Sequence, residues 1–154
     1  NGITTGAGGA GKFAPDNTCT REQMVTFLWR LSGSPEPNEG CGFTDVAEDA
    51  WYYKAVSWAK ENGITTGISD TLFGVGGSCT REMCVTFLWR AAGKPSASSP
   101  SGFEDVKAGA YYEEAVAWAS ETGVTTGVSA TKFGVGGLCT RAMIVTFMYR
   151  YSNL

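Results

Sequence analysis

The chain has 154 residues, 43% of them apolar, and it carries 12 basic against 15 acidic side chains, for a net charge of −3. This length and apolar content suit a folded domain or a short array of repeats, and the acidic balance argues against a broad nucleic-acid-binding surface. The absence of histidine excludes Ser-His-Asp and Cys-His triads, and no apolar run is long enough to cross a membrane.

A repeat of 60 residues organises the sequence. Cys-Thr-Arg occurs at residues 19–21, 79–81 and 139–141, and Val-Thr-Phe at 25–27, 85–87 and 145–147. Gly-Ile-Thr-Thr-Gly at 63–67 recurs with one change at 123–127, and unchanged at 2–6, one residue out of phase. We therefore expect two complete units and the back half of a third, within a single domain spanning 1–154. The back half of repeat one covers 1–37, repeat two 38–97 and repeat three 98–154. Because the front of repeat one is missing and Asn1 is not an initiator Met, we expect a fragment of a larger exported protein.

In chain order, the first expected helix begins after Thr20 and ends near Gly33. A proline-containing linker at 34–42 leads to a second helix over about 49–62, closed by Gly63. A glycine-rich loop at 67–78 precedes a third helix, which is capped by Thr80 and ends near Gly93. The same order then repeats through 108–122 and the helix after Thr140. The pattern predicts an all-α fold.

Arg21, Arg81 and Arg141 each follow the capping threonine, at the first helical position. A cation there opposes the helix dipole at a cost of about 0.3–1 kcal/mol, and the same choice is made in all three units. A guanidinium beside free backbone N–H groups can bind a carboxylate or phosphate. Pairing with Asp45 or Asp105 inside the protein explains the placement equally well, and the sequence leaves both interpretations open. For the other arginine set, near the helix ends at 30, 90 and 150, we favour a structural or surface role.

The cysteines of the repeat precede the capping threonines and are spaced to pack against residues 24, 84 and 144, which favours a structural role. A disulfide is conceivable between Cys79 and Cys84. Most tryptophans have the helical spacing of core residues, whereas Trp51 and Tyr111 are candidates for a groove wall. The glycine-rich loops contain no phosphate-binding motif, and no opposed carboxylate pair suggests a glycosidase.

Together these motifs resemble the S-layer homology (SLH) family. The matching residues are Phe43-Thr44-Asp45-Val46, the run from Trp51 to Ala59, Phe13-Ala14-Pro15 and Thr20-Arg21. The chain departs from the family pattern where Thr-Arg-Ala-Glu loses its Glu to Gln23, Met83 and Met143, and where the loop proline becomes Val75 and Val135.

The resemblance implies a pseudo-threefold helical spindle of three SLH units that anchors an exported protein to the bacterial cell wall without catalysis. The expected partner is a secondary cell-wall polysaccharide linked to peptidoglycan, often pyruvylated, held in grooves between the units. No cofactor, metal, nucleic acid or membrane insertion is expected, and the location implied is the extracellular cell surface. The candidate glycan-binding residues are Arg21, Arg81, Arg141, Asp45, Asp105, Trp51, Tyr111, Thr20, Thr80 and Thr140.

The alternative is a protein–protein or self-assembly module of a surface layer. It predicts an apolar interface that does not depend on the three arginines.

Overall fold

The computed structural model describes residue 4, residue 6 and residues 11–154, and in this part of the chain all regular secondary structure is helical. The helices are α1 (Arg21–Leu31), α2 (Tyr53–Glu61), α3 (Arg81–Ala91), α4 (Glu113–Glu121) and α5 (Arg141–Tyr151). The predicted all-α class is confirmed. Apart from Thr4 and Gly6, the first Gly-Ile-Thr-Thr-Gly motif lies outside the described residues.

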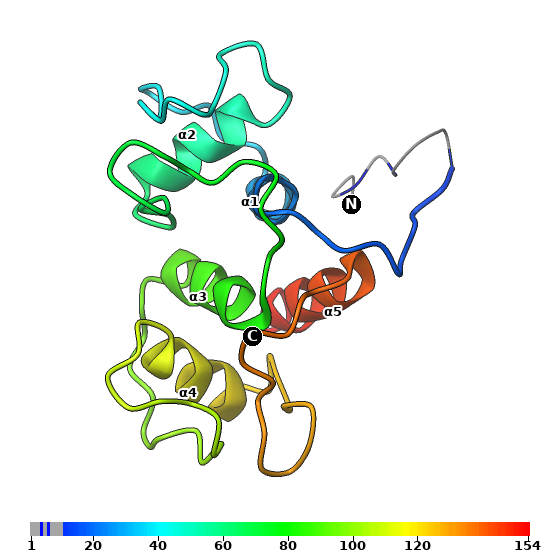
Figure 1. Ribbon diagram of the computed structural model, residues 1–154, viewed down its shortest axis with the longest axis vertical. Helices are drawn as coiled ribbons and strands as arrows, with labels where there is room; N and C mark the ends of the chain where they lie inside the picture. Colours follow the sequence, from blue (N-terminus) through cyan, green and yellow to red (C-terminus); the bar gives the residue numbers. More distant parts are fainter. Residues whose placement is uncertain (1–3, 5, 7–10) are drawn as a thin grey trace.

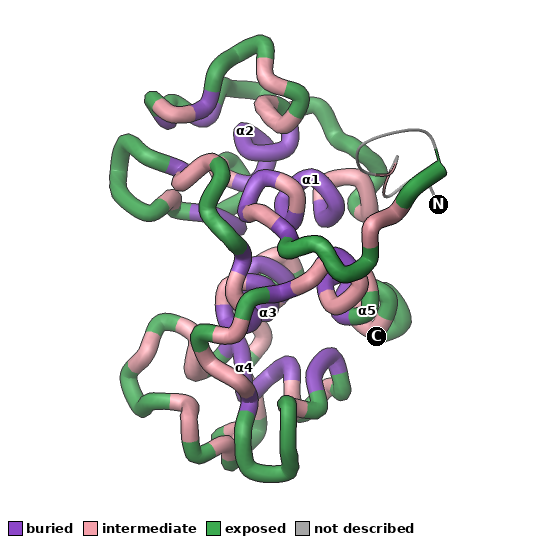
Figure 2. The backbone as a smooth tube through the Cα atoms, turned by 45° about the vertical axis from the view of Figure 1, so that its right-hand side comes forward, coloured by how far each residue is buried: buried purple, intermediate pink, exposed green. Residues whose placement is uncertain are grey.

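The helices form a central group with two outer layers (Figure 1). Helix α3 contacts both α1 and α5, while α2 packs against α1 and α4 packs against α3. The buried residues are concentrated along these helices, and the long connecting loops are largely exposed (Figure 2).

The chain segments that enter the three central helices are joined by a closed ring of backbone hydrogen bonds. The N–H of Cys19 donates to the Cys139 carbonyl at 2.9 Å, that of Cys79 to the Cys19 carbonyl at 2.8 Å, and that of Cys139 to the Cys79 carbonyl at 2.9 Å. Each of these three segments is therefore bonded to the next, and the ring relates the three Cys-Thr-Arg positions as a pseudo-threefold axis would.

The outer helices begin later than the sequence predicted, at Tyr53 instead of about 49 and at Glu113 instead of about 108. Their first expected turn is made of separate four-residue turns; ahead of α2, Ala50 N–H donates to Ala47 O and Tyr53 N–H to Ala50 O. The predicted C-terminal ending of α2 is confirmed. Gly63 is left-handed (φ +66°), and the N–H groups of Gly63 and Ile64 bond to the carbonyls of Lys60 and Ala59.

The capping threonines follow the prediction only in part. Thr140 Oγ1 accepts from Met143 N–H at 3.3 Å, as expected for an N-cap. At Thr20 the backbone N–H donates to Gln23 Oε1 at 3.3 Å, so the side chain that replaces the family's Glu retains half of a capping box. Thr80 Oγ1 is buried without a hydrogen-bond partner in the described chain.

Candidate functional site

Arg21, Arg81 and Arg141 start the three central helices and reach across to the following unit. Their Nε atoms donate to the carbonyls of Phe73 (3.1 Å), Phe133 (2.9 Å) and Phe13 (2.9 Å), respectively. Each guanidinium carbon also lies 5.0–5.4 Å from the centroids of two aromatic rings, one from the loop and one from the next central helix. These contacts fix the planar guanidinium between two units.

None of these three arginines has a carboxylate partner in the described residues, where Lys54–Glu36 is the one ion pair. Arg21 is only 6% exposed, and burial lowers the pKa of its guanidinium, although Cys79, Tyr111, Glu22 and Asp45 act in the opposite direction. The interpretation as an internal Arg–Asp pair is therefore wrong for this structure. Other guanidinium donors of the three arginines contact Met83 Sδ (Arg21), Thr125 Oγ1 (Arg81) and Thr4 Oγ1 (Arg141) at 3.1–3.5 Å.

Asp45 and Asp105 instead hold the glycine-rich loops. The Asp45 carboxylate accepts from the N–H groups of Phe73, Gly74 and Val75 at 2.7–2.9 Å, and Asp105 accepts in the same way from residues 133–135. Partial burial acts to raise the pKa of both carboxyls, but the backbone donors outweigh it and hold each pKa below its usual value. Because each carboxylate orders the loop whose carbonyl receives an arginine Nε, the aspartates position the arginines and do not line the cavities.

Two cavities lie beside the arginines at equivalent repeat positions. The larger has a volume of about 360 Å³ and the smaller about 280 Å³. The larger is lined by Arg21, Thr65, Thr66, Gly67, Ile68, Met83, Thr86, Phe87, Arg90 and Tyr111. The smaller is lined by Arg81, Thr125, Thr126, Gly127, Ala142, Met143, Thr146, Phe147 and Arg150. Each therefore combines two arginines, several hydroxyl groups, a glycine backbone and an aromatic ring.

The second arginine of each cavity is Arg90 or Arg150. The sequence favoured a structural or surface role for both, and the structure shows that each of them also lines a cavity. Arg90 Nη1 donates to the Ile64 carbonyl at 3.2 Å, and Arg150 Nη1 to the Val124 carbonyl at 3.4 Å. Burial lowers the pKa of Arg90, which is half-buried. The signal was present in the sequence, because all six arginines occupy only two repeat positions.

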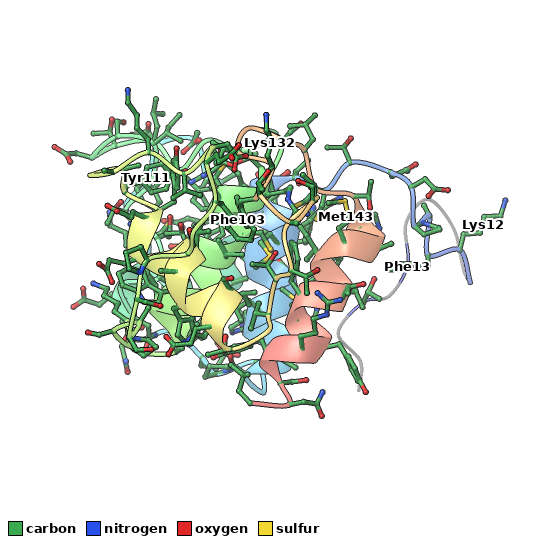
Figure 3. All side chains as sticks on the ribbon, turned by 90° about the horizontal axis from the view of Figure 1, so that it is seen from below. Lys12, Phe13, Phe103, Tyr111, Lys132 and Met143 are labelled. Atoms are coloured by element: carbon green, nitrogen blue, oxygen red, sulfur yellow. The ribbon has the colours of Figure 1, made fainter. Side chains whose placement is uncertain are left out.

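The predicted aromatic wall is present at one cavity. Tyr111 lies in the turn ahead of α4, and Met143 lies in the first turn of α5 (Figure 3). Tyr111 lines the larger cavity and Met143 lines the smaller one. Trp51 is exposed and packs edge-on against Tyr52, and it lines neither cavity. The candidate residues Thr20, Thr80 and Thr140 also lie outside the two cavity linings.

Glu22 and Glu82, which stand where the family has alanine, are buried and extend the loop anchoring. Glu22 Oε2 accepts from Gly76 N–H at 3.1 Å, and Glu82 Oε2 from Gly136 N–H at 2.9 Å. In the third unit the corresponding helix residue is Ala142, and the loop residue facing that position in the repeat is Asp16 instead of glycine.

All five cysteines are buried and have free thiols, so the disulfide considered between Cys79 and Cys84 is absent. Cys84 Sγ lies 3.8 Å from Met24 Sδ, across the centre of the helix group. Burial raises the pKa of Cys19 to about 12, with Arg141 opposing the shift, and burial also raises the pKa of Cys79 and Cys84. The cysteines are therefore core residues, as the sequence favoured.

The S-layer homology domain matches residues 42–82 and 102–142, together more than half of the chain. The chain belongs to the S-layer homology domain family. Each matched stretch runs from the Phe-x-Asp-Val segment through an outer helix to the first arginine of a central helix. It therefore contains the loop anchor and the loop, and that loop holds the arginine of the preceding unit. SLH domains are cell-wall anchoring modules of S-layer and other surface proteins.

Three curated relatives have matching segments. A "Cell surface protein" of Thermoanaerobacter kivui is 32% identical over 70% of this chain and 15% of its own length. A "Surface-layer 125 kDa protein" of Lysinibacillus sphaericus is 33% identical over 70% of this chain and 9% of its own length. An "Exoglucanase XynX" of Acetivibrio thermocellus is 26% identical over 90% of this chain and 13% of its own length. The chain thus spans less than a sixth of each of these relatives.

No helix in the described part of the chain is both long and apolar enough to span a membrane. Across the same residues, no group of three or more acidic or cysteine side chains is placed to hold a metal ion.

Proposed function

We propose that this SLH segment anchors a larger surface protein to the bacterial cell wall by binding an anionic secondary cell-wall polysaccharide in the grooves between its units. The observation that carries the proposal is a pair of arginines in each cavity, Arg21 with Arg90 and Arg81 with Arg150, without a carboxylate partner in the described chain. A carboxylate on the glycan would complete the charge balance that the protein leaves open.

The chemistry of the cavity walls supports a sugar ligand. Tyr111, which is 57% exposed, offers apolar ring surface to a sugar face, and the exposed Thr66 offers a hydroxyl group. The Arg21 guanidinium is already held by Phe73 O and two rings, so little side-chain entropy is lost when an anion binds. A pyruvate ketal supplies a carboxylate on a compact sugar, and we propose it as the recognised group.

The segment itself is proposed to be non-catalytic. Retaining and inverting glycosidases need two opposed carboxyl groups roughly 5–9.5 Å apart at the sugar. Neither cavity is lined by an Asp or Glu, so the groove residues are suited to holding a glycan and not to cleaving it. The location proposed is the bacterial cell wall or cell surface, and the three units are proposed to cover residues 1–37, 38–97 and 98–154.

The test is direct binding to a short glycan fragment that carries one pyruvate ketal, measured by calorimetry, followed by pull-down with purified cell walls. A hydrogen bond to a charged group contributes about 1.5–3 kcal/mol, so Arg21→Ala is expected to weaken binding in its cavity by about tenfold or more. Arg81→Ala should do the same in the second cavity. The short fragment is required because a polymer can bind several cavities at once, and the remaining contacts would mask the loss of binding at one cavity.

The matched control is Lys107→Ala, which removes one positive charge from an exposed position outside both cavities. It is expected to leave binding unchanged, and circular dichroism should confirm that all variants are folded. The proposal would be contradicted if the Arg21→Ala/Arg81→Ala variant bound intact walls as well as the parent chain does. It would also be contradicted if the parent chain bound walls stripped of the secondary polymer as well as intact walls.

Exposed apolar side chains keep self-assembly as the second candidate. Ile68, which also lines the larger cavity, and Val128, at the equivalent loop position, are each 60% exposed. If these residues form an interface, Ile68→Ser/Val128→Ser should abolish association between copies, and the arginine variants should not affect it.

A further inference from the structure

The four methionines of the chain form two pairs in opposite environments. Met24 and Met148 lie in the core and are at most 1% exposed. Met83 and Met143 are only partly buried, and each of them lines one of the two cavities. We therefore expect a small oxidant dissolved in water to reach the second pair and not the first.

The Met83 sulfur contacts the buried arginine of the larger cavity. Arg21 Nη1 donates to Met83 Sδ at 3.5 Å, while Arg21 Nε is held by the Phe73 carbonyl. In the smaller cavity Arg81 Nη2 instead donates to the hydroxyl oxygen of Thr125, at 3.4 Å. Because a thioether sulfur is a weak acceptor, the Met83 contact leaves the Arg21 N–H available to a stronger one.

Oxidation of Met83 changes this contact. The sulfur attacks one oxygen of hydrogen peroxide, so that an S–O bond forms and the O–O bond breaks. The proton of that oxygen moves to the departing hydroxide, which leaves as water; the sulfur loses two electrons and the peroxide gains them. The product, methionine sulfoxide, has a polar oxygen on the atom that already accepts from Arg21. A hydrogen bond from a guanidinium to such an oxygen is charge-assisted and stronger than one to a thioether.

We propose that Met83 is a modification site, and that its oxidation to the sulfoxide by a hydroperoxide lowers the affinity of the larger cavity for an anionic glycan. This inference rests on the proposed function and adds a regulation of the same site. The sulfoxide oxygen occupies an Arg21 N–H that a glycan carboxylate would use, and it takes up part of a cavity of about 360 Å³. Loss of one such hydrogen bond weakens binding by about tenfold. The change is reversible, because sulfoxide reductases restore the thioether.

The first measurement treats the folded chain with dilute hydrogen peroxide and follows each methionine by mass spectrometry of its peptides. Met83 and Met143 are expected to be oxidised several-fold faster than Met24 and Met148, which serve as buried internal standards. The five buried thiols, counted with a disulfide reagent after unfolding, should remain unchanged over the same period. The proposal is overturned if Met83 reacts no faster than the two core methionines.

The second measurement follows the side-chain Nε–H signal of Arg21 by NMR and needs no glycan. Met83→Leu removes the sulfur beside Arg21, and the matched control Met143→Leu removes the equivalent sulfur of the smaller cavity. Oxidation should shift the Arg21 signal in the parent chain and in Met143→Leu, and it should leave the signal of Met83→Leu in place. A shift that persists in Met83→Leu, or no shift in the parent, would show that the sulfoxide does not act on Arg21 and would overturn the proposal.

The third measurement is calorimetry with the short pyruvylated fragment, in an Arg81→Ala background so that binding is dominated by the larger cavity. Each protein is compared with itself before oxidation, and circular dichroism checks that the oxidised chain is folded. Oxidation should weaken binding by about tenfold when Met83 is present, and methionine sulfoxide reductases with a thiol reductant should restore it. With Met83→Leu, oxidation should change nothing.

The outcomes separate this proposal from the proposed function. If the oxidised chain binds the fragment as tightly as the unoxidised chain, or loses binding only because it unfolds, regulation through Met83 is overturned and the proposed function stands. If the unoxidised chain does not bind the fragment, the proposed function and its regulation are both overturned. The peptide masses and the Arg21 signal then still decide whether Met83 is a modification site.

Discussion

Replacing Asp105 with alanine is expected to loosen one glycine-rich loop and, through it, the arginine that the loop holds. The carboxylate accepts three backbone hydrogen bonds, at 2.7 Å from Phe133, 2.7 Å from Gly134 and 2.9 Å from Val135. A hydrogen bond to a charged group contributes about 1.5–3 kcal/mol. Because the carboxylate is only half-buried and water can replace part of the bonding, we expect a total loss of about 2–4 kcal/mol, not the sum of three.

The assay is urea unfolding monitored by tryptophan fluorescence. The slope of the free energy of unfolding against urea concentration should be the same in all variants if unfolding is two-state. Glu104→Ala is the matched control, since it removes the same charge from the adjacent, exposed residue. Asp105→Asn retains one acceptor oxygen and should fall between the two. A loss below about 0.5 kcal/mol for Asp105→Ala, typical of a neutral surface change, would refute the assignment of Asp105 as a loop anchor.

Three further predictions follow from the same geometry. The lowered pKa values of Asp45 and Asp105 contribute stability that is fully present above the unfolded pKa of about 3.9 and is lost as pH falls through the folded values. Acid titration of Asp105→Asn should therefore show a weaker pH dependence than the parent chain, and an unchanged profile would contradict this. Gly134→Ala should destabilise more than Gly109→Ala. Both glycines have positive φ, but a Cβ at 134 would lie 2.8 Å from Val128 Cγ1 and 3.2 Å from Arg81 Nε, whereas open space surrounds 109. If both variants lowered the melting temperature equally, backbone strain alone would account for the effect and the predicted clash at 134 would be wrong. The five buried thiols should react with a disulfide reagent at pH 8 only as fast as the protein unfolds, and rapid labelling of the native chain would contradict the burial.

The sequence predicted the fold well because the repeat removed most of the ambiguity. Helix type and the glycine ending of α2 followed from local patterns, but the helix starts at 53 and 113 did not, because the preceding aromatic residues have helical spacing while their backbone forms separate turns. Helical periodicity reports which residues face the core, and it does not report where intrahelical bonding begins.

The residues of the candidate site also differ in whether a local pattern or a distant contact determines their role. The first-position arginines were found because their placement opposes the helix dipole, a local conflict that points to an interaction elsewhere. The role of Asp45 was not predictable from spacing, since its three donors lie 28–30 residues away in a loop. Arg90 was set aside because a cation at a helix end already has a sufficient local explanation, and only the packing of the next unit reveals the cavity beside it.

The ring of backbone hydrogen bonds at Cys19, Cys79 and Cys139 has a consequence for how the molecule folds. In a linear repeat array each unit contacts only its neighbours, so folding can begin anywhere and the end units fray first. Here the first and last central helices are joined across 120 residues of chain, as the bond from Cys19 N–H to Cys139 O requires. The ring cannot close until the third unit has been synthesised, so a chain stopped after the second unit would leave two of the three ring bonds unmade. Such contacts of high sequence separation slow folding but leave no terminal unit to unravel separately.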